Sequence, residues 1–177
     1  MSSHMKSRAT RTLGVAAALL TVALAAAAPA AAVTAAQRAE QVRYGTETVN
    51  LGNYQFMQRK ADFLANGCAT VSACRKPVPY NGFDWSTDGC SQTPASWKPI
   101  FDPACQEHDF GYRNFGKGLT LGRNETTRAW IDDRFRTEMK AICNYKYSNW
   151  SQYANLQACF KEADVMYAAV RVANSWA

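Results

Sequence analysis

The stretch Cys105-Gln-Glu-His-Asp-Phe-Gly-Tyr112 places a cysteine, a histidine, an aspartate and a tyrosine at spacings of three and four residues. On a helix these four side chains form a single stripe. The preceding pair Asp102-Pro103 is typical of a helix start, because Asp accepts hydrogen bonds from the first free amides and Pro fits the first helical position. We therefore expect a helix from Pro103 to about Phe115, ended by the glycines that follow.

A second helix follows after a short connection. Asn124 is a good N-cap, and Glu125 is favourable near the positive end of the helix. We expect this helix to reach about Tyr145, and the short link makes it an antiparallel neighbour of the first. Asp132 belongs with its apolar residues, so it faces the first helix rather than water. The apolar stripe consists of Ile131, Phe135, Met139 and Ile142.

The segment before these helices contains a further helix and a long loop. Residues 37–64 are polar and helix-prone, with breaks near Gly45 and Gly52, and apolar spacing predicts a helix from about Leu51 to Ala65. Residues 75–101 carry four of the six prolines, which predicts a loop. A loop of that length is usually functional or disordered. Cys90 within this loop and Cys105 shortly after it favour an ordered loop.

A last helix spans roughly Ser151 to Ala173. No convincing alternating strand pattern occurs, so the fold class is all-α. We expect a disulfide-bridged helical domain with two central antiparallel helices. The residues expected to face inward from the last helix are Tyr153, Leu156, Phe160, Ala163, Tyr167 and Val170.

The beginning of the chain has the order of a secretory signal peptide. Three basic residues precede an apolar run from Leu13 to Ala28 that ends in small residues. A membrane anchor is the alternative, but the run has about 16 strongly apolar residues, against the ~20 that a span needs. We expect residues 1–36 to be the signal peptide, with Met1–His4 a cloning remnant if Met5 is the start, and residues 37–177 to form a single domain that is secreted.

The net charge and the histidine count of residues 37–177 each argue against one function class. The formal charge of the whole chain is +6, and it falls to +3 without the three basic residues of the leader. That excess is too small for nucleic-acid binding, although it suits an anionic surface. His108 is the only histidine after the leader, which excludes multi-histidine zinc sites.

All six cysteines lie after the leader, and no Cys-x-x-Cys occurs. In an oxidising compartment an even number of cysteines indicates three disulfides rather than a metal cluster. Six cysteines allow 15 pairings. We favour pairing between sequence neighbours, namely Cys68–Cys74, Cys90–Cys105 and Cys143–Cys159.

The two central helices present one candidate catalytic pair. A buried carboxylate needs a partner, and His108 is the natural partner for Asp132. In such a pair the imidazole takes a proton from water while the carboxylate holds the tautomer and stabilises the imidazolium. The alternative is a structural histidine bonded to a neighbouring helix. The adjacent Asp109 and the acidic loop favour the catalytic interpretation.

The loop Asp84-Trp-Ser-Thr-Asp88-Gly89 combines oxygen side chains with a glycine turn, which suits a hard cation such as calcium. It partly matches an EF-hand, but Ala95 stands where that motif requires a bidentate Glu, so the EF-hand fails. A calcium site completed by Asp109 remains, and the alternative is a turn that its Asp residues merely cap. Serine-hydrolase elbows, zinc-protease motifs and phosphate-binding glycine loops do not occur.

Three motifs together resemble the secreted phospholipases A2, specifically the small bacterial and fungal branch. The resemblance covers roughly residues 83–173, over half of the chain after the leader. Gly89 departs from the family pattern, because a larger apolar residue is common at its position. The motifs are Phe83-Asp84-Trp85-Ser86-Thr87-Asp88-x-Cys90, then Cys105-x-x-His108-Asp109-Phe110-Gly111-Tyr112-Arg113-Asn114, then Arg128-x-x-Ile131-Asp132-x-x-Phe135 with Met139-Lys140.

The resemblance implies calcium-dependent hydrolysis of the sn-2 ester of glycerophospholipids, which releases a fatty acid and a lysophospholipid. It implies that His108 is the general base and Asp132 its partner. It also implies that Asp88 and Asp109 bind calcium through carboxylates and Gly89 through its backbone carbonyl. The bridges Cys90–Cys105 and Cys143–Cys159 fit the family as well.

The implied partner is a phospholipid membrane interface, which a monomer would meet; Trp85 and Trp97 in the loop are candidates to face it. Two alternatives to the enzyme remain. One is a catalytically silent phospholipase-like protein that binds membranes or a receptor, and the other is a secreted binding module without calcium. The presence of His108, Asp109 and Asp132 favours the enzyme over both.

Overall fold

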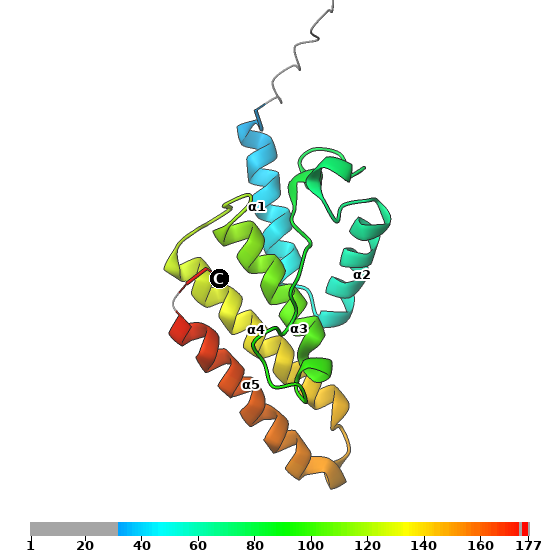
Figure 1. Ribbon diagram of the computed structural model, residues 1–177, viewed down its shortest axis with the longest axis vertical. Helices are drawn as coiled ribbons and strands as arrows, with labels where there is room; N and C mark the ends of the chain where they lie inside the picture. The colour runs from blue at the N-terminus through cyan, green and yellow to red at the C-terminus, as the bar shows by residue number, and fades with distance from the viewer. Residues whose placement is uncertain (1–31, 174, 177) are drawn as a thin grey trace, which may run out of the picture. The chain divides into compact units, whose positions relative to one another are not determined.

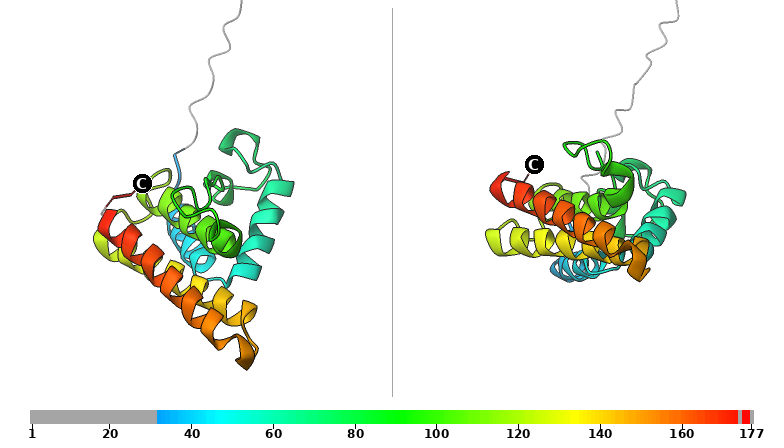
Figure 2. Two further views of the ribbon diagram at one scale, coloured as in Figure 1. Left: turned by 60° about the horizontal axis from the view of Figure 1, so that its bottom comes forward. Right: turned by 90° about the horizontal axis from the view of Figure 1, so that it is seen from below.

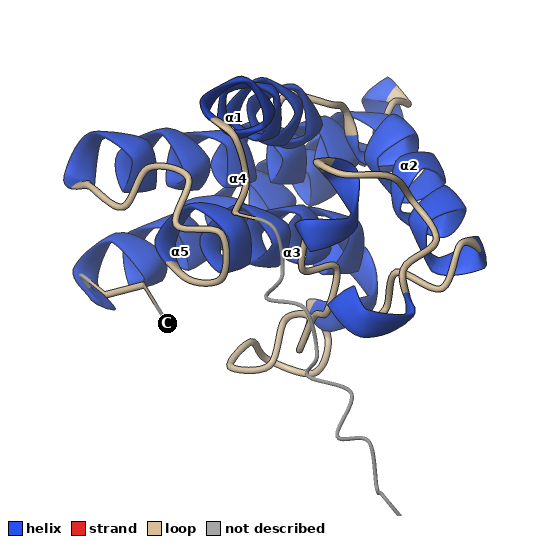
Figure 3. Ribbon diagram, turned by 90° about the horizontal axis from the view of Figure 1, so that it is seen from above, coloured by secondary structure: helices blue, strands red, loops and turns tan. Residues whose placement is uncertain are grey.

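A computed structural model of the chain describes residues 32–173 and 175–176, so nearly all of the predicted signal peptide lies outside the described residues. The described part contains α-helices and short helical turns but no strand, as Figures 1 and 3 show. The predicted all-α class is therefore confirmed. No helix in this part of the chain is long and apolar enough to cross a membrane. The α-helices are α1 (Ala35–Val49), α2 (Asn53–Ala65), α3 (Lys98–Gly111), α4 (Glu125–Lys146) and α5 (Tyr153–Ala173).

Helix α1 runs through Gly45, so the break predicted there is wrong. A β-carbon at this glycine would lie 2.9 Å from the side chain of Leu121 and 3.3 Å from that of Phe115. Gly45 therefore serves the close packing of the residues after α3 against α1 rather than a turn. The break predicted near Gly52 is confirmed, because Gly52 is the N-cap of α2.

Helix α3 begins at Lys98, five residues before the predicted start at Pro103. Pro99 lies in the first turn, where a missing backbone amide costs no hydrogen bond, and Phe101 in that turn is fully buried. Asp102 accepts a hydrogen bond of 2.6 Å from the Gln106 side chain instead of capping the helix. The burial of the first turn thus outweighs the local start signal.

Helices α3 and α4 pack against each other and run antiparallel, as predicted (Figure 1). A π-helical turn, Tyr112–Gly116, extends α3, and Asn124 caps α4 by accepting a bond of 2.9 Å from the Thr127 amide. The two helices approach closely at Gly111, where a β-carbon would lie 2.7 Å from Ile131. This contact brings Tyr112, which follows Gly111, within hydrogen-bonding distance of Asp132, which follows Ile131.

Two groups of buried residues lie on opposite sides of α3. One is mainly aromatic and includes Trp85, whose ring centroid lies 4.4 Å from that of Phe110. Trp85 is only 2% exposed, so this candidate for membrane contact is a core residue instead. The other group joins α3 to α4 and α5, which lie side by side in Figure 2. Ala163 of α5 is buried there as predicted, whereas Tyr153 is exposed.

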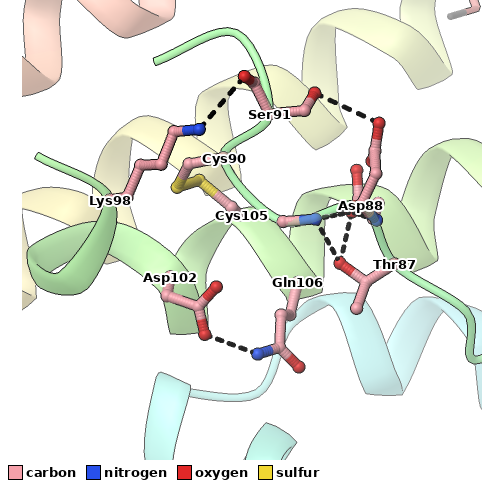
Figure 4. Close-up of a disulfide and its surroundings, with 10 residues drawn as sticks. Thr87, Asp88, Cys90, Ser91, Lys98, Asp102, Cys105 and Gln106 are labelled. Carbon is pink, nitrogen blue, oxygen red and sulfur yellow. Dashed lines mark hydrogen bonds between the residues drawn. A yellow bond between two sulfur atoms is a disulfide. The ribbon is translucent and has the colours of Figure 1, made fainter. Parts of the chain in front are cut away.

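The three predicted disulfides are present. Cys68–Cys74 closes a short loop after α2, and Cys143–Cys159 joins the end of α4 to α5. Cys90–Cys105 joins the long loop to α3 (Figure 4). The bridge Cys90–Cys105 holds the acidic part of the loop over the face of α3 that carries His108.

Candidate active site

His108 and Asp132 meet across the contact between α3 and α4. The imidazole Nε2 lies 2.8 Å from Oδ1 of Asp132, which is the contact that the sequence predicted. The Asp132 carboxylate is fully buried, and the His108 ring is 11% exposed where it lines a cavity. A histidine with one nitrogen on a buried carboxylate and an edge toward open space can exchange protons with a molecule in that space.

Asp132 accepts more than one hydrogen bond. The Tyr112 hydroxyl donates to Oδ1 at 2.8 Å, and Nη1 of Arg171 donates to Oδ2 at 2.8 Å. Burial acts to raise the pKa of Asp132, but the hydrogen bonds from His108 and Arg171 outweigh it, and the pKa is lowered. Burial and the bond to Asp132 raise the pKa of Tyr112, so its hydroxyl remains a donor.

Two arginines surround this carboxylate, and sequence reasoning assigned neither of them a role. Arg128, one turn before Asp132 on α4, lies 3.4 Å from Oδ2. Its spacing of four residues was the signal that could have identified it. Arg171 comes from the last turns of α5, and no sequence pattern links it to Asp132. Both arginines also pair with Glu125, the first residue of α4.

A cavity of about 620 Å³ opens over this pair. Helix α3 supplies His108 and Asp109, and the long loop supplies Asp88 and Gly89. Helix α5 supplies an apolar wall that the sequence predicted only in part. The wall residues are Val165, Met166, Ala169 and Val170. The cavity therefore combines a polar floor with an apolar side.

The acidic loop closes onto Asp109. One carboxylate oxygen, Oδ2, accepts bonds from the Thr87 hydroxyl at 2.5 Å and from the amides of Asp88 and Gly89 at 3.1 and 3.2 Å. Figure 4 shows Thr87 and Asp88 beside the disulfide that holds the loop. Burial raises the pKa of Asp109, and the nearby charge of Asp88 adds to the effect despite the bond from Thr87.

Two of the three predicted calcium ligands thus contribute carboxylates to one place. Asp88 also accepts from Ser91 at 3.1 Å and lies 3.3 Å from Arg113. Residues 32–173 contain no group of three or more His, Cys, Asp or Glu side chains that could hold a metal. Paired carboxylates on a glycine loop do suit a hard cation if backbone oxygens complete the set. Gly89 contacts Asp109 through its amide.

A family model described as prokaryotic phospholipase A2 matches residues 53–174. The chain belongs to this family. Two curated relatives are similar to this phospholipase A2, and both are named secretory phospholipase A2. The one from Arthroderma benhamiae is 33% identical over 110 residues, which is 61% of this chain and 71% of the relative. The one from Beauveria bassiana is 37% identical over 100 residues, which is 55% of this chain and 47% of the relative. No solved structure matches.

Asp84 lies apart from the other acids of the phospholipase loop. Its Oδ1 accepts from the Ser86 amide at 2.9 Å and from the Ser86 hydroxyl at 2.6 Å, so it caps its own turn. Buried Asn114 binds the backbone amide and carbonyl of Asp84 at 2.8 and 2.9 Å. Asn114 was noted in a motif, but its work in fixing the loop to α3 depends on the fold.

Proposed function

We propose that this phospholipase A2 hydrolyses the sn-2 ester of glycerophospholipids to a fatty acid and a lysophospholipid, with calcium and a water that His108 activates. The observation that carries the proposal is the contact of 2.8 Å between Nε2 of His108 and the buried Asp132 carboxylate beneath the cavity. The family assignment supports the reaction class, and the contact supports these residues as its base.

The proton transfer follows from the state of the pair. An ionised Asp132 accepts from Nε2–H, which places the lone pair on Nδ1, so Nδ1 is the atom that takes a proton from water. The carboxylate then stabilises the imidazolium. Asp132 keeps its charge because Arg171 and Tyr112 bind it as well.

The predicted calcium ligands are Asp88 and Asp109 through their carboxylates and Gly89 through its backbone carbonyl. Bound calcium supplies a Lewis acid that polarises the ester carbonyl and stabilises the oxyanion. Burial and the charge of Asp88 raise the pKa of Asp109, and a bound cation would relieve this repulsion, which supports a cation at this place. The role of the chain is to hold these two acids beside His108 through the bridge Cys90–Cys105.

The apolar side of the cavity supports an acyl chain as the group next to the ester. Val165, Met166 and Ala169 of α5 offer no hydrogen-bonding side chain, so a hydrocarbon fits there without leaving a polar group unpaired. The three disulfides and the secretory relatives fit an extracellular protein. We propose that residues 1–36 direct its secretion and that the released enzyme acts as a monomer on a phospholipid surface.

The test is the release of fatty acid from phosphatidylcholine vesicles that carry different acyl chains at sn-1 and sn-2. We expect release of the sn-2 chain with calcium and none with EDTA. Release that persists in EDTA would remove calcium from the proposal. No release with calcium, together with calcium binding by calorimetry, would indicate the catalytically silent alternative.

A further inference from the structure

Exposed aromatic side chains gather at one end of the helical domain. Tyr145 and Trp150 are each 89% exposed, and Tyr153 is 65% exposed. All three lie at the turn between α4 and α5, at the bottom of Figure 1. Tyr54 at the start of α2 is also exposed and shares a surface hollow of about 710 Å³ with Tyr145. We call these four residues the aromatic end.

The hollow places the aromatic end beside the candidate active site. Its lining includes Pro99 and Ile100 in the first turn of α3. Pro94 and Trp97, which come just before that turn, line the active-site cavity. Residues that line the two openings therefore adjoin at the single turn that begins α3.

The aromatic end is basic. The segments that carry its four residues, 50–61 and 139–161, contain no Asp or Glu, and neither does the neighbouring segment 89–101. Lys98 lies between the two openings, and Lys146 lines the hollow; both are exposed. The acid that lines the hollow, Glu138, is buried and pairs with Arg134, so it presents little charge.

The aromatic end is also held rigidly. Cys143–Cys159 bridges α4 to α5 close to the turn, and both sulfurs are buried. The backbone around Trp150 is therefore already ordered, so binding through this residue costs little conformational entropy. Tyr and Trp side chains favour the boundary between water and hydrocarbon, because one end of each is polar and the rest is apolar.

We propose that the aromatic end is a docking surface for anionic phospholipid membranes, distinct from the catalytic groups. The aromatic rings enter the interface while Lys98 and Lys146 meet the anionic headgroups. This inference rests on the proposed function for its meaning, since docking here would hold the enzyme at the surface that contains its substrate. It concerns binding alone, so it can be tested without turnover.

The experiment is vesicle sedimentation in the His108→Gln background, which prevents hydrolysis of the vesicles. The probes are phosphatidylcholine vesicles with and without phosphatidylglycerol. We expect binding to the anionic vesicles, and we expect Tyr145→Ser with Trp150→Ser to weaken it about tenfold or more. Lys98→Gln with Lys146→Gln should also weaken it about tenfold or more, in a way that high salt mimics.

Val172→Ser is the matched control, because Val172 is exposed near the other end of α5 and should bind as well as the parent. Equal binding by the aromatic double variant and the parent overturns the proposal, and equal binding to neutral vesicles overturns its anionic part. In the His108 enzyme, both double variants should hydrolyse dispersed short-chain phosphatidylcholine at the normal rate. Failure of the unmodified enzyme in that assay would count against the proposed function, not against docking.

Discussion

Two sites adjoin the cavity, the His108–Asp132 pair and the Asp88–Asp109 pair. They differ in how the negative charge of their carboxylates is balanced. Asp132 meets His108, Tyr112 and two arginines, so its negative charge is balanced by groups from α3, α4 and α5. Asp88 and Asp109 meet each other, loop amides and hydroxyls, and one arginine at 3.3 Å.

The two pairs therefore differ in whether residues of the chain compensate their negative charge. The chain itself supplies every cation around Asp132, so that place is complete as folded. At the loop, burial and the charge of Asp88 raise the pKa of Asp109, and the proposed calcium ion would relieve the repulsion between the two carboxylates.

The largest effect is expected from removing the base of the completed pair. His108→Gln keeps a side chain that can bond to Asp132 but cannot take a proton, and general-base catalysis typically contributes ~10²–10⁴-fold. We expect the initial rate of fatty-acid release to fall by at least about a hundredfold with an unchanged melting temperature. A loss of under about threefold would show that His108 is not the base.

The Asp88–Asp109 pair is tested by Asp109→Asn, which keeps the shape of the side chain and removes its charge. We expect activity to fall about 10²-fold, as when one oxyanion-stabilising group is lost. Calcium should raise the melting temperature of the parent but not of the variant. The matched control is Asp84→Asn in the same loop, which caps its own turn and should change neither quantity. A calcium-induced rise that survives in Asp109→Asn would remove this residue from the site.

Substitution of Arg171 tests whether the His108–Asp132 pair depends on the cation that α5 supplies. Arg171→Met leaves Asp132 with less compensation, so the carboxylate favours a protonated imidazole more strongly. We expect the acidic limb of the pH–rate profile to move to higher pH and the rate below it to fall about tenfold. Arg171→Lys should restore part of the loss. Arg136→Met removes another α4–α5 ion pair, at 2.7 Å from Asp164, and should leave the profile in place. A profile that does not move would reduce Arg171 to a structural role.

The smallest effect concerns a further acid, Glu107, which is buried and has no hydrogen-bond partner for either carboxylate oxygen in the described part of the chain. Burial, with a contribution from Glu138, raises the pKa of Glu107 to about 9. A raised pKa in the folded state means that the unfolding free energy falls as pH rises from about 4.5 toward 9. We expect Glu107→Gln to raise the melting temperature by a few degrees at pH 8 and by less at pH 5. An equal effect at both values would contradict this protonation state.

Local chemistry in the sequence predicted much of this architecture. The cap at Asn124 and the apolar period after it place α4 correctly, and the stripe on α3 faces Asp132 as expected. Pairing of neighbouring cysteines holds for all three bridges. These features depend on contacts between residues close in sequence or on one long regular helix, so the pattern carries the information.

Other features depend on partners far along the chain. The start of α3 moves to Lys98 because Phe101 is buried against residues of α4 and α5. Trp85 is buried because aromatic residues of α2 and α3 surround it, although its loop suggested exposure. Neither outcome is visible in the local sequence, since both depend on which surfaces meet.

By itself, the amino-acid sequence determined the helical class, the cysteine partners and the residue types of both acidic pairs, because periodicity, capping and side-chain chemistry act locally. Only the tertiary structure decided that Arg171, 39 residues after Asp132, would neutralise that buried carboxylate. It likewise decided that Tyr54, at the start of α2, would share a surface hollow with Tyr145 of α4. Packing brings together groups that no spacing rule connects, and a buried charge is stable only where such groups arrive.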